Sequence, residues 1–186
     1  VIEAINISVG FDDKPILKDF SVKILRGDRV GIIGPNGAGK TTLLKCLTGD
    51  LTPDQGTVKL GTNLEATFLD QHRTLIKDTD TVWETLSDGG DHIMVRGHSK
   101  HIISYIKDFL FDSSQAHSPV ASLSGGEKNR LLLAKTLAHP TNLLILDEPT
   151  NDLDMDTLDL LQDVLSDYQG TLLLVSHDRD FLDRLV

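Results

Sequence analysis

The 186-residue sequence has a single cysteine, Cys46, so it can form no internal disulfide. Disulfides belong mainly to oxidising compartments, and we therefore expect a reducing, cytoplasmic location. Long apolar runs are also missing, and none approaches the roughly 20 residues that a helix needs to cross a bilayer. We expect no membrane span in this chain. The first residue is Val1 and no signal-peptide pattern follows it, so we expect a fragment of a longer chain.

Positive charge is scarce toward the C-terminus of this acidic chain, whose formal net charge is −10. Residues 147–183 hold eleven acidic side chains and a single base, Arg179. Nucleic-acid surfaces require clustered lysine and arginine, so this stretch is a poor candidate for one. The composition, 39% hydrophobic and 25% charged, is that of a globular protein with one well-buried core.

A glycine-rich stretch at residues 34–41 has the spacing of a phosphate-binding loop, with two glycines, a lysine and a threonine. An apolar run at residues 29–33 precedes it and leucines at helical spacing follow it, which predicts strand, loop and helix and disfavours a mere glycine-rich turn. Glycines let the backbone wrap round a polyphosphate, Lys40 can reach the β- and γ-phosphates, and the Thr41 hydroxyl can bind Mg²⁺. The residues predicted to bind nucleotide here are Gly34, Pro35, Asn36, Gly37, Ala38, Gly39, Lys40, Thr41 and Thr42.

Two carboxylates, Asp147 and Glu148, follow an apolar run at residues 143–146 that predicts a buried parallel strand. In a protein with a phosphate-binding loop, an acid at such a strand end meets Mg²⁺, and Asp147 fits that role. Glu148 lies one residue further and can orient the attacking water and accept its proton. The structural alternative is a strand that leaves the core into a polar turn before Pro149.

A third pattern, Leu-Ser-Gly-Gly-Glu at residues 123–127, opens a leucine-rich helix predicted over residues 127–137. Ser124 and Glu127 have the spacing of a capping box, so helix initiation alone can explain them. Ser124, Gly125 and Gly126 also form an exposed helix N-terminus of the kind that binds phosphate. Because the chain already has one phosphate loop, we expect this surface to face the nucleotide of a different chain.

Strands and helices alternate along most of the sequence, which predicts an α/β fold with a mostly parallel core sheet covered on both faces. Alternating apolar and polar residues predict an N-terminal antiparallel part at residues 4–9 and 20–25, with a turn at residues 10–15. Further strands are predicted at residues 57–60, 65–69 and 171–175, and further helices at residues 157–168 and 178–185. Few strand signals occur in residues 72–122, where helices at residues 82–86 and 101–111 predict a small helical subdomain.

The order of the four motifs GPNGAGKT, LSGGE, LLILDEP and SHD resembles that of the ATP-binding-cassette (ABC) ATPases. LSGGE is similar to the signature sequence of that family. The segments TVWETLSDGGD, YIKDFLF, EPTNDLD and VSHDRDFLDR resemble in particular the second cassette of soluble ABC-F proteins of the Uup type. The resemblance covers the whole chain. It implies a P-loop NTPase fold, residues 1–186 as a single ABC ATP-binding domain, and ATP and Mg²⁺ as its ligands.

The resemblance also implies roles for residues that the local patterns leave open. Gln71 corresponds to the glutamine that senses the γ-phosphate and the metal, and His177 to the histidine that contacts the γ-phosphate. Residues 151–154 correspond to the D-loop between the two sites, and Phe11 to an aromatic that stacks on adenine. Glu148, His177 and Gln71 are then the expected catalytic residues. From the residues alone, three structural alternatives stay open: Gln71 as a surface residue, His177 as a helix cap and Phe11 as a core residue.

The function that follows is an ATPase cassette that closes head to tail with a second cassette, in the same full-length chain or in a second copy. The ABC-F resemblance implies conformational work on a ribosome or nucleic-acid client through parts outside this chain. One alternative is the motor subunit of a membrane transporter, which uses the same site chemistry. Another is an ATP-gated binding module with little hydrolysis, against which Glu148 and His177 argue.

Overall fold

The computed structural model of the chain describes residues 2–12, 14–69, 76–87, 89–150 and 153–186. The chain forms two compact units, and each is described by itself. The first comprises Val1–Ala66, Asn142–Glu148 and Gln169–Val186, and the second comprises Thr67–Thr141 and Pro149–Tyr168. Both units are therefore assembled from segments that are distant in the sequence.

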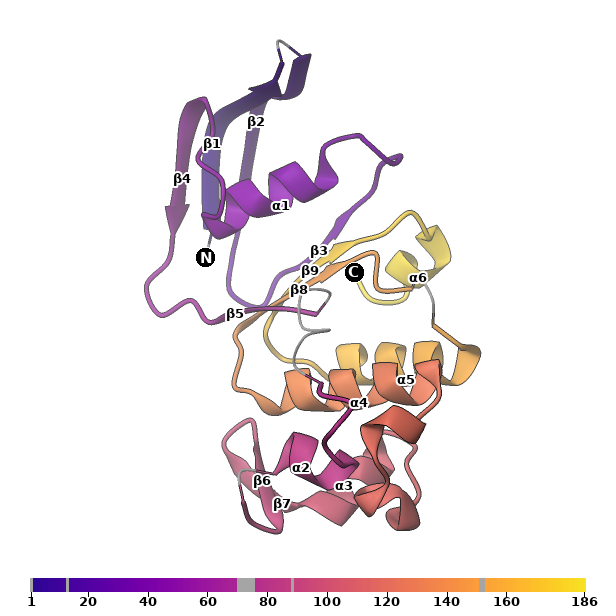
Figure 1. Cartoon of the computed structure of the whole chain (residues 1–186). Helices are drawn as coiled ribbons and strands as arrows, with labels where there is room; N and C mark the ends of the chain where they lie inside the picture. Colours follow the sequence, from indigo (N-terminus) through magenta and orange to yellow (C-terminus); the bar gives the residue numbers. More distant parts are fainter. Residues whose placement is uncertain (1, 13, 70–75, 88, 151–152) are drawn as a thin grey trace. The chain divides into compact units, whose positions relative to one another are not determined.

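The first unit contains the predicted antiparallel sheet, which has three strands (Figure 1). In spatial order they are β2 (Lys14–Ile24), β1 (Ile2–Phe11) and β4 (Gln55–Leu60). This sheet explains the alternation of apolar and polar residues in the sequence, because the apolar residues Ile2, Ala4, Ile7 and Val9 of β1 are buried. Helix α1 (Lys40–Thr48) packs against β1 and β4. The turn between β1 and β2 is shorter than predicted, since β1 extends to Phe11.

A second sheet, whose first three strands are parallel, forms the core of the first unit. In spatial order its strands are β3 (Arg29–Ile32), β9 (Thr171–Val175), β8 (Leu143–Asp147) and β5 (Ala66–Phe68), the last of which begins where the first unit ends. Every residue of β9 is buried, as the continuous apolar run predicts. Val175 pairs with Ile32 on one side and with Asp147 on the other. The carboxyl ends of β3, β9 and β8 therefore share one edge, where ligand sites of open α/β sheets lie. Helix α6 (Arg179–Asp183) follows β9.

The second unit is mainly helical. Its helices are α2 (Val82–Leu86), α3 (Ile102–Asp108), α4 (Gly125–Ala138) and α5 (Met155–Ser166), with short 3-10 helices η2 (Ser113–His117) and η3 (Val120–Ser122). Helices α4 and α5 pack together. Both begin two residues before their predicted starts, because Ser124 and Asp154 cap their first turns. This unit therefore contains α4 and α5 as well as the described part of residues 72–122.

Residues 72–122, where few strand signals occur and a helical subdomain was predicted, also contain a two-stranded hairpin, β6 (His92–Val95) and β7 (His98–His101). Its turn residues Arg96 and Gly97 both have positive φ, 49° and 84°, the geometry of a tight type I′ turn. The sequence of these strands shows no alternation of apolar and polar residues, because seven of their eight side chains lie outside the core. The helix predicted over residues 101–111 starts only at Ile102, and the His101 side chain caps it by accepting the Ile103 N–H at 3.2 Å.

Candidate functional site

The loop between β3 and α1 presents helix N–H groups without a side-chain cap. Gly39 is the N-cap residue of α1, in a left-handed conformation with φ 91°. A Cβ on Gly39 would also overlap the side chain of Ile16, so this position requires glycine for both conformation and space. Gly37 has φ 81°. The first turn of α1 is therefore available to an anion, as the predicted phosphate loop requires.

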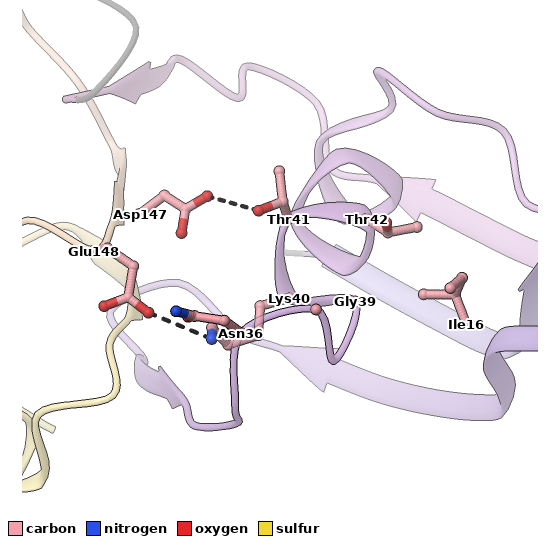
Figure 2. A pocket seen from close by; sticks show the side chains of 9 residues that line it. Ile16, Asn36, Gly39, Lys40, Thr41, Thr42, Asp147 and Glu148 are labelled. Carbon is pink, nitrogen blue, oxygen red and sulfur yellow. Dashed lines mark hydrogen bonds and ion pairs between the residues drawn. The ribbon is translucent and has the colours of Figure 1, made fainter. Parts of the chain in front are cut away.

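Lys40 is the first residue of α1, and its ammonium group is held at the loop. The Nζ atom donates to the Gly34 carbonyl at 2.6 Å and to the Pro35 carbonyl at 3.2 Å. It also forms an ion pair with Glu148 Oε1 at 3.4 Å, with only 10% of the lysine side chain exposed. Figure 2 shows Lys40 and Glu148 pointing toward each other. The structure thus places a fixed cation beside the N-terminus of α1.

Thr41 and Asp147 converge beside this cation. The Thr41 hydroxyl donates to Asp147 Oδ2 at 3.0 Å, and the carboxylate comes from the end of β8 (Figure 2). A hydroxyl and a carboxylate are the hard oxygen ligands that Mg²⁺ prefers, and Mg²⁺ commonly takes its remaining ligands from water and nucleotide phosphates. Among the described residues there is no group of three or more His, Cys, Asp or Glu that could hold a metal. The pair fits a nucleotide-associated Mg²⁺ and not an all-protein metal cage.

Glu148 adopts an unusual backbone conformation for its type, with φ 50°. Its N–H donates to the Val175 carbonyl at 2.9 Å, which ties the strained residue to β9. Its Oε2 atom accepts from His177 Nδ1 at 2.8 Å and from the His177 backbone N–H at 3.3 Å. Its Oε1 atom is buried and, within the part of the chain that the structure describes, accepts no hydrogen bond although Lys40 lies close. The carboxylate is therefore fixed between a cation and a histidine.

A pocket of about 270 Å³ lies at these residues. Its lining consists of Ile16, Asn36, Gly37, Gly39, Lys40, Thr41, Thr42, Asp147 and Glu148. Six of these nine residues were predicted from the glycine loop, and Asp147 and Glu148 were predicted as the strand-end carboxylates. Sequence reasoning missed Ile16, whose only signal is an apolar residue one position after a proline. Phe11, the predicted adenine contact, is 50% exposed on β1 and is not one of the described residues that line this pocket.

In the second unit, Ser124 acts as the cap of α4. Its hydroxyl accepts the Glu127 N–H at 3.2 Å, and Glu127 Oε2 accepts the Ser124 N–H at 2.8 Å. Gln115 donates to the other Glu127 oxygen at 2.7 Å. The backbone hydrogen bond from Ser124 and the side-chain bond from Gln115 hold the pKa of Glu127 below its usual range. The capping box expected from LSGGE is thus present in the structure, whereas a phosphate contact at this helix N-terminus stays a prediction.

The structure brings Lys40, Thr41, Asp147, Glu148 and His177 together within the first unit. Ser124, Gly125 and Gly126 lie in the second unit at the start of α4. Gln71 and the first two residues of the predicted D-loop, Asn151 and Asp152, fall outside the described residues. Their roles stay predictions.

A profile of the ABC transporter family matches residues 17–151 of the sequence. The chain belongs to this family. The fold of an ABC cassette is confirmed by solved structures: the dimeric ATP-binding cassette MJ0796 bound to ADP and Pi has a TM-score of 0.68 at 21% identity, over 99% of this chain and 91% of that one. CbiO1 of Clostridium perfringens, part of the ABC transporter complex CbiONQ, has a TM-score of 0.69 at 24% identity, over 97% of this chain and 80% of that one.

Curated relatives confirm the resemblance to ABC-F proteins of the Uup type. The ATP-binding protein Uup of Caulobacter vibrioides is 62% identical over 186 residues, which is 100% of this chain and 31% of that protein. Uup of Escherichia coli is 50% identical over 100% of this chain and 29% of its own length. The energy-dependent translational throttle protein EttA of Mycobacterium tuberculosis is 45% identical, over 99% of this chain and 33% of its own length. This ABC cassette thus spans about a third of the length of these relatives. Among the described residues, no helix is both long and apolar enough to cross a membrane.

Proposed function

We propose that this ABC cassette is a Mg²⁺-dependent ATPase that converts ATP and water to ADP and phosphate. The observation that carries the proposal is the convergence of Lys40, Thr41, Asp147 and Glu148 at the uncapped N-terminus of α1. A cation, two oxygen ligands for a metal and a second carboxylate are the groups that phosphoryl transfer to water needs. The relatives' names, ATP-binding protein Uup, support the same ligand.

Each of these residues has a distinct part in the proposed reaction. The α1 N–H groups and Lys40 bind the β- and γ-phosphates, and Thr41 and Asp147 hold Mg²⁺, with Gln71 as a further ligand. When bound by Thr41 and Asp147, Mg²⁺ would supply neutralisation of the charge that develops on the phosphate oxygens. Glu148 orients the attacking water and accepts its proton, because its carboxylate projects from the strand end next to Asp147. His177 fixes that carboxylate through Nδ1 and contacts the γ-phosphate.

We further propose that the site is completed by a second cassette, in the same full-length chain or a second copy. Ser124, Gly125 and Gly126 of one cassette would then meet the nucleotide held by Lys40 of the other, so that closure excludes water. The dimeric MJ0796 cassette with ADP and Pi supports this arrangement as a fold-level analogy. We propose one ATP-binding domain over residues 1–186, with residues 72–122 as its helical subdomain and a cytoplasmic location.

The client is proposed from the relatives. EttA is named a translational throttle, which favours conformational work on a ribosome, or on another nucleic-acid client, through parts of the protein outside this cassette. A transporter motor is the second candidate, favoured by CbiO1, a part of an ABC transporter complex. The much higher identity to Uup and EttA supports the first. An ATP-gated module with little hydrolysis is the third, and the ordered Glu148 and His177 pair disfavours it.

The test measures ATPase activity of the purified chain against its own concentration. A site shared between copies predicts binding of Mg-ATP by single chains but a turnover per chain that rises with concentration. High turnover that does not depend on chain concentration would contradict the shared site. No ATP binding at all would contradict the assignment of the pocket.

A further inference from the structure

The two glycines at the start of α4 have different surroundings. A Cβ on Gly125 would meet nothing within 4 Å, whereas a Cβ on Gly126 would overlap the Oδ2 atom of Asp154, with Asp154 Cγ at 3.0 Å. Neither glycine has a positive φ, so both lie in backbone that any L-residue adopts. Space, and not conformation, therefore distinguishes Gly126 from Gly125.

Asp154 links the starts of two helices. Its Oδ1 atom accepts the Thr157 N–H at 2.8 Å and so caps α5. Its other oxygen faces the α-carbon of Gly126 and lies 3.9 Å from Nη1 of Arg130. One carboxylate thus touches the N-terminal turns of both α4 and α5.

Arg130 is the third residue of this contact, beside Gly126 and Asp154. Only 13% of its side chain is exposed, and its guanidinium carbon lies 5.7 Å from the centre of the Phe111 ring. Its Nε atom is buried and has no hydrogen-bond partner within the described part of the chain. Its charge also contributes, after the hydrogen bonds from Ser124 and Gln115, to the lowered pKa of Glu127. Arg130 is therefore a nearly buried cation between acids in the first turn of α4 and at the cap of α5.

We propose that Asp154 is a positioning residue that fixes the N-terminal turn of α4, and that position 126 is glycine to admit its carboxylate. Arg130 keeps the carboxylate in place by charge. The packing part of the proposal is independent of nucleotide. Only its consequence for hydrolysis rests on the proposed function, in which the start of α4 completes the site of a second cassette.

The packing part is tested by chemical unfolding of the full chain carrying Gly125→Ala, Gly126→Ala, Asp154→Ser and Gly126→Ala with Asp154→Ser. Serine keeps a capping oxygen for α5 but removes the overlapping atom. Gly125→Ala should raise the folding equilibrium constant a few-fold, because alanine favours helix. Gly126→Ala should lower it about tenfold in the parent, and should be neutral or stabilising beside Asp154→Ser. Equal effects of Gly126→Ala in both backgrounds, or a stabilising effect in the parent, would overturn the proposal.

The positioning part is tested by ATP titration and steady-state turnover of the same variants. Gly126→Ala should lower kcat several-fold and leave the ATP affinity of the single chain unchanged, because Lys40 and Thr41 are untouched. Asp154→Ser, alone or beside Gly126→Ala, should also lower kcat several-fold at unchanged ATP affinity, because the carboxylate that fixes the α4 turn is lost. A parent kcat in Asp154→Ser would overturn the positioning role. A parent that binds no ATP would instead refute the proposed function, while the unfolding comparison would still decide the packing.

Discussion

Glu148→Gln is expected to separate nucleotide binding from hydrolysis in this cassette. The parent carboxylate lies 3.4 Å from Lys40 Nζ, and the two side chains are only 17% and 10% exposed. Their Coulomb attraction at that distance is on the order of 5 kcal/mol at an effective dielectric constant of about 20. Desolvation cancels most of it: a hydrogen bond to a charged group contributes a net value of about 1.5–3 kcal/mol, and we expect the lower end of that range for an ion pair at 3.4 Å.

A γ-phosphate at the start of α1 competes with Glu148 for Lys40. Removing the carboxylate charge should therefore tighten ATP binding by about tenfold, since about 1.4 kcal/mol corresponds to a factor of ten. Hydrolysis should fall by about 100-fold or more, because the general base is lost. The assay is a nucleotide titration with a single-turnover measurement, beside Asp147→Asn as the comparison. Asp147→Asn should weaken Mg-ATP binding, because it removes a charged metal ligand.

Three outcomes would contradict these assignments. Unchanged ATP affinity in Glu148→Gln would show that the Lys40–Glu148 pair does not compete with phosphate. Hydrolysis at the parent rate would show that Glu148 is not the base. If Glu148→Gln bound ATP no better than Asp147→Asn, the roles of the two carboxylates would be wrongly assigned.

The remaining predictions concern stability. Tyr105→Phe should lower the free energy of unfolding by about 1 kcal/mol, because the buried Tyr105 hydroxyl donates to the Ala134 carbonyl at 2.7 Å. Tyr168→Phe, which removes a more exposed bond to the Thr141 carbonyl, is the matched control in urea unfolding and should cost less. The lowered pKa values of Glu127 and Glu84 mean that their caps stabilise fully above the ordinary carboxyl pKa of 4.5 and are lost as the pH falls through the folded values. The melting temperature should therefore drop below pH 4.5, and Glu127→Gln should flatten that drop because glutamine caps without titrating.

The sequence was sufficient to predict how the strand-end carboxylates meet the glycine loop. Residues 143–146 are an unbroken apolar run, which predicts a strand buried on both faces, and parallel strands bring their carboxyl ends to one edge. Residues 34–41 carry the loop itself. Two local signals far apart in the chain thus define the pocket through a general rule of sheet topology.

Features that depend on long-range packing could not be predicted. Glu148 precedes Pro149, which favours an extended backbone, yet its φ is 50° because β9 and His177 hold it. Ile16 lies against Gly39 only because β2 passes the loop, and no pattern in β2 indicates this. The hairpin β6–β7 was missed because only Ile93 of its side chains is in the core.

In the proposed function, the loop at the start of α1 binds the phosphates of ATP through Lys40. The most direct measurement is Mg-ATP titration of Lys40→Ala beside Lys45→Ala, which removes the same charge from an exposed position of the same helix. Lys40→Ala should abolish ATP binding, because the phosphates lose their fixed cation. Lys45→Ala should bind ATP as the parent does, and both should remain folded. Equal ATP affinity in Lys40→Ala and the parent would contradict the assignment of this loop as the phosphate site.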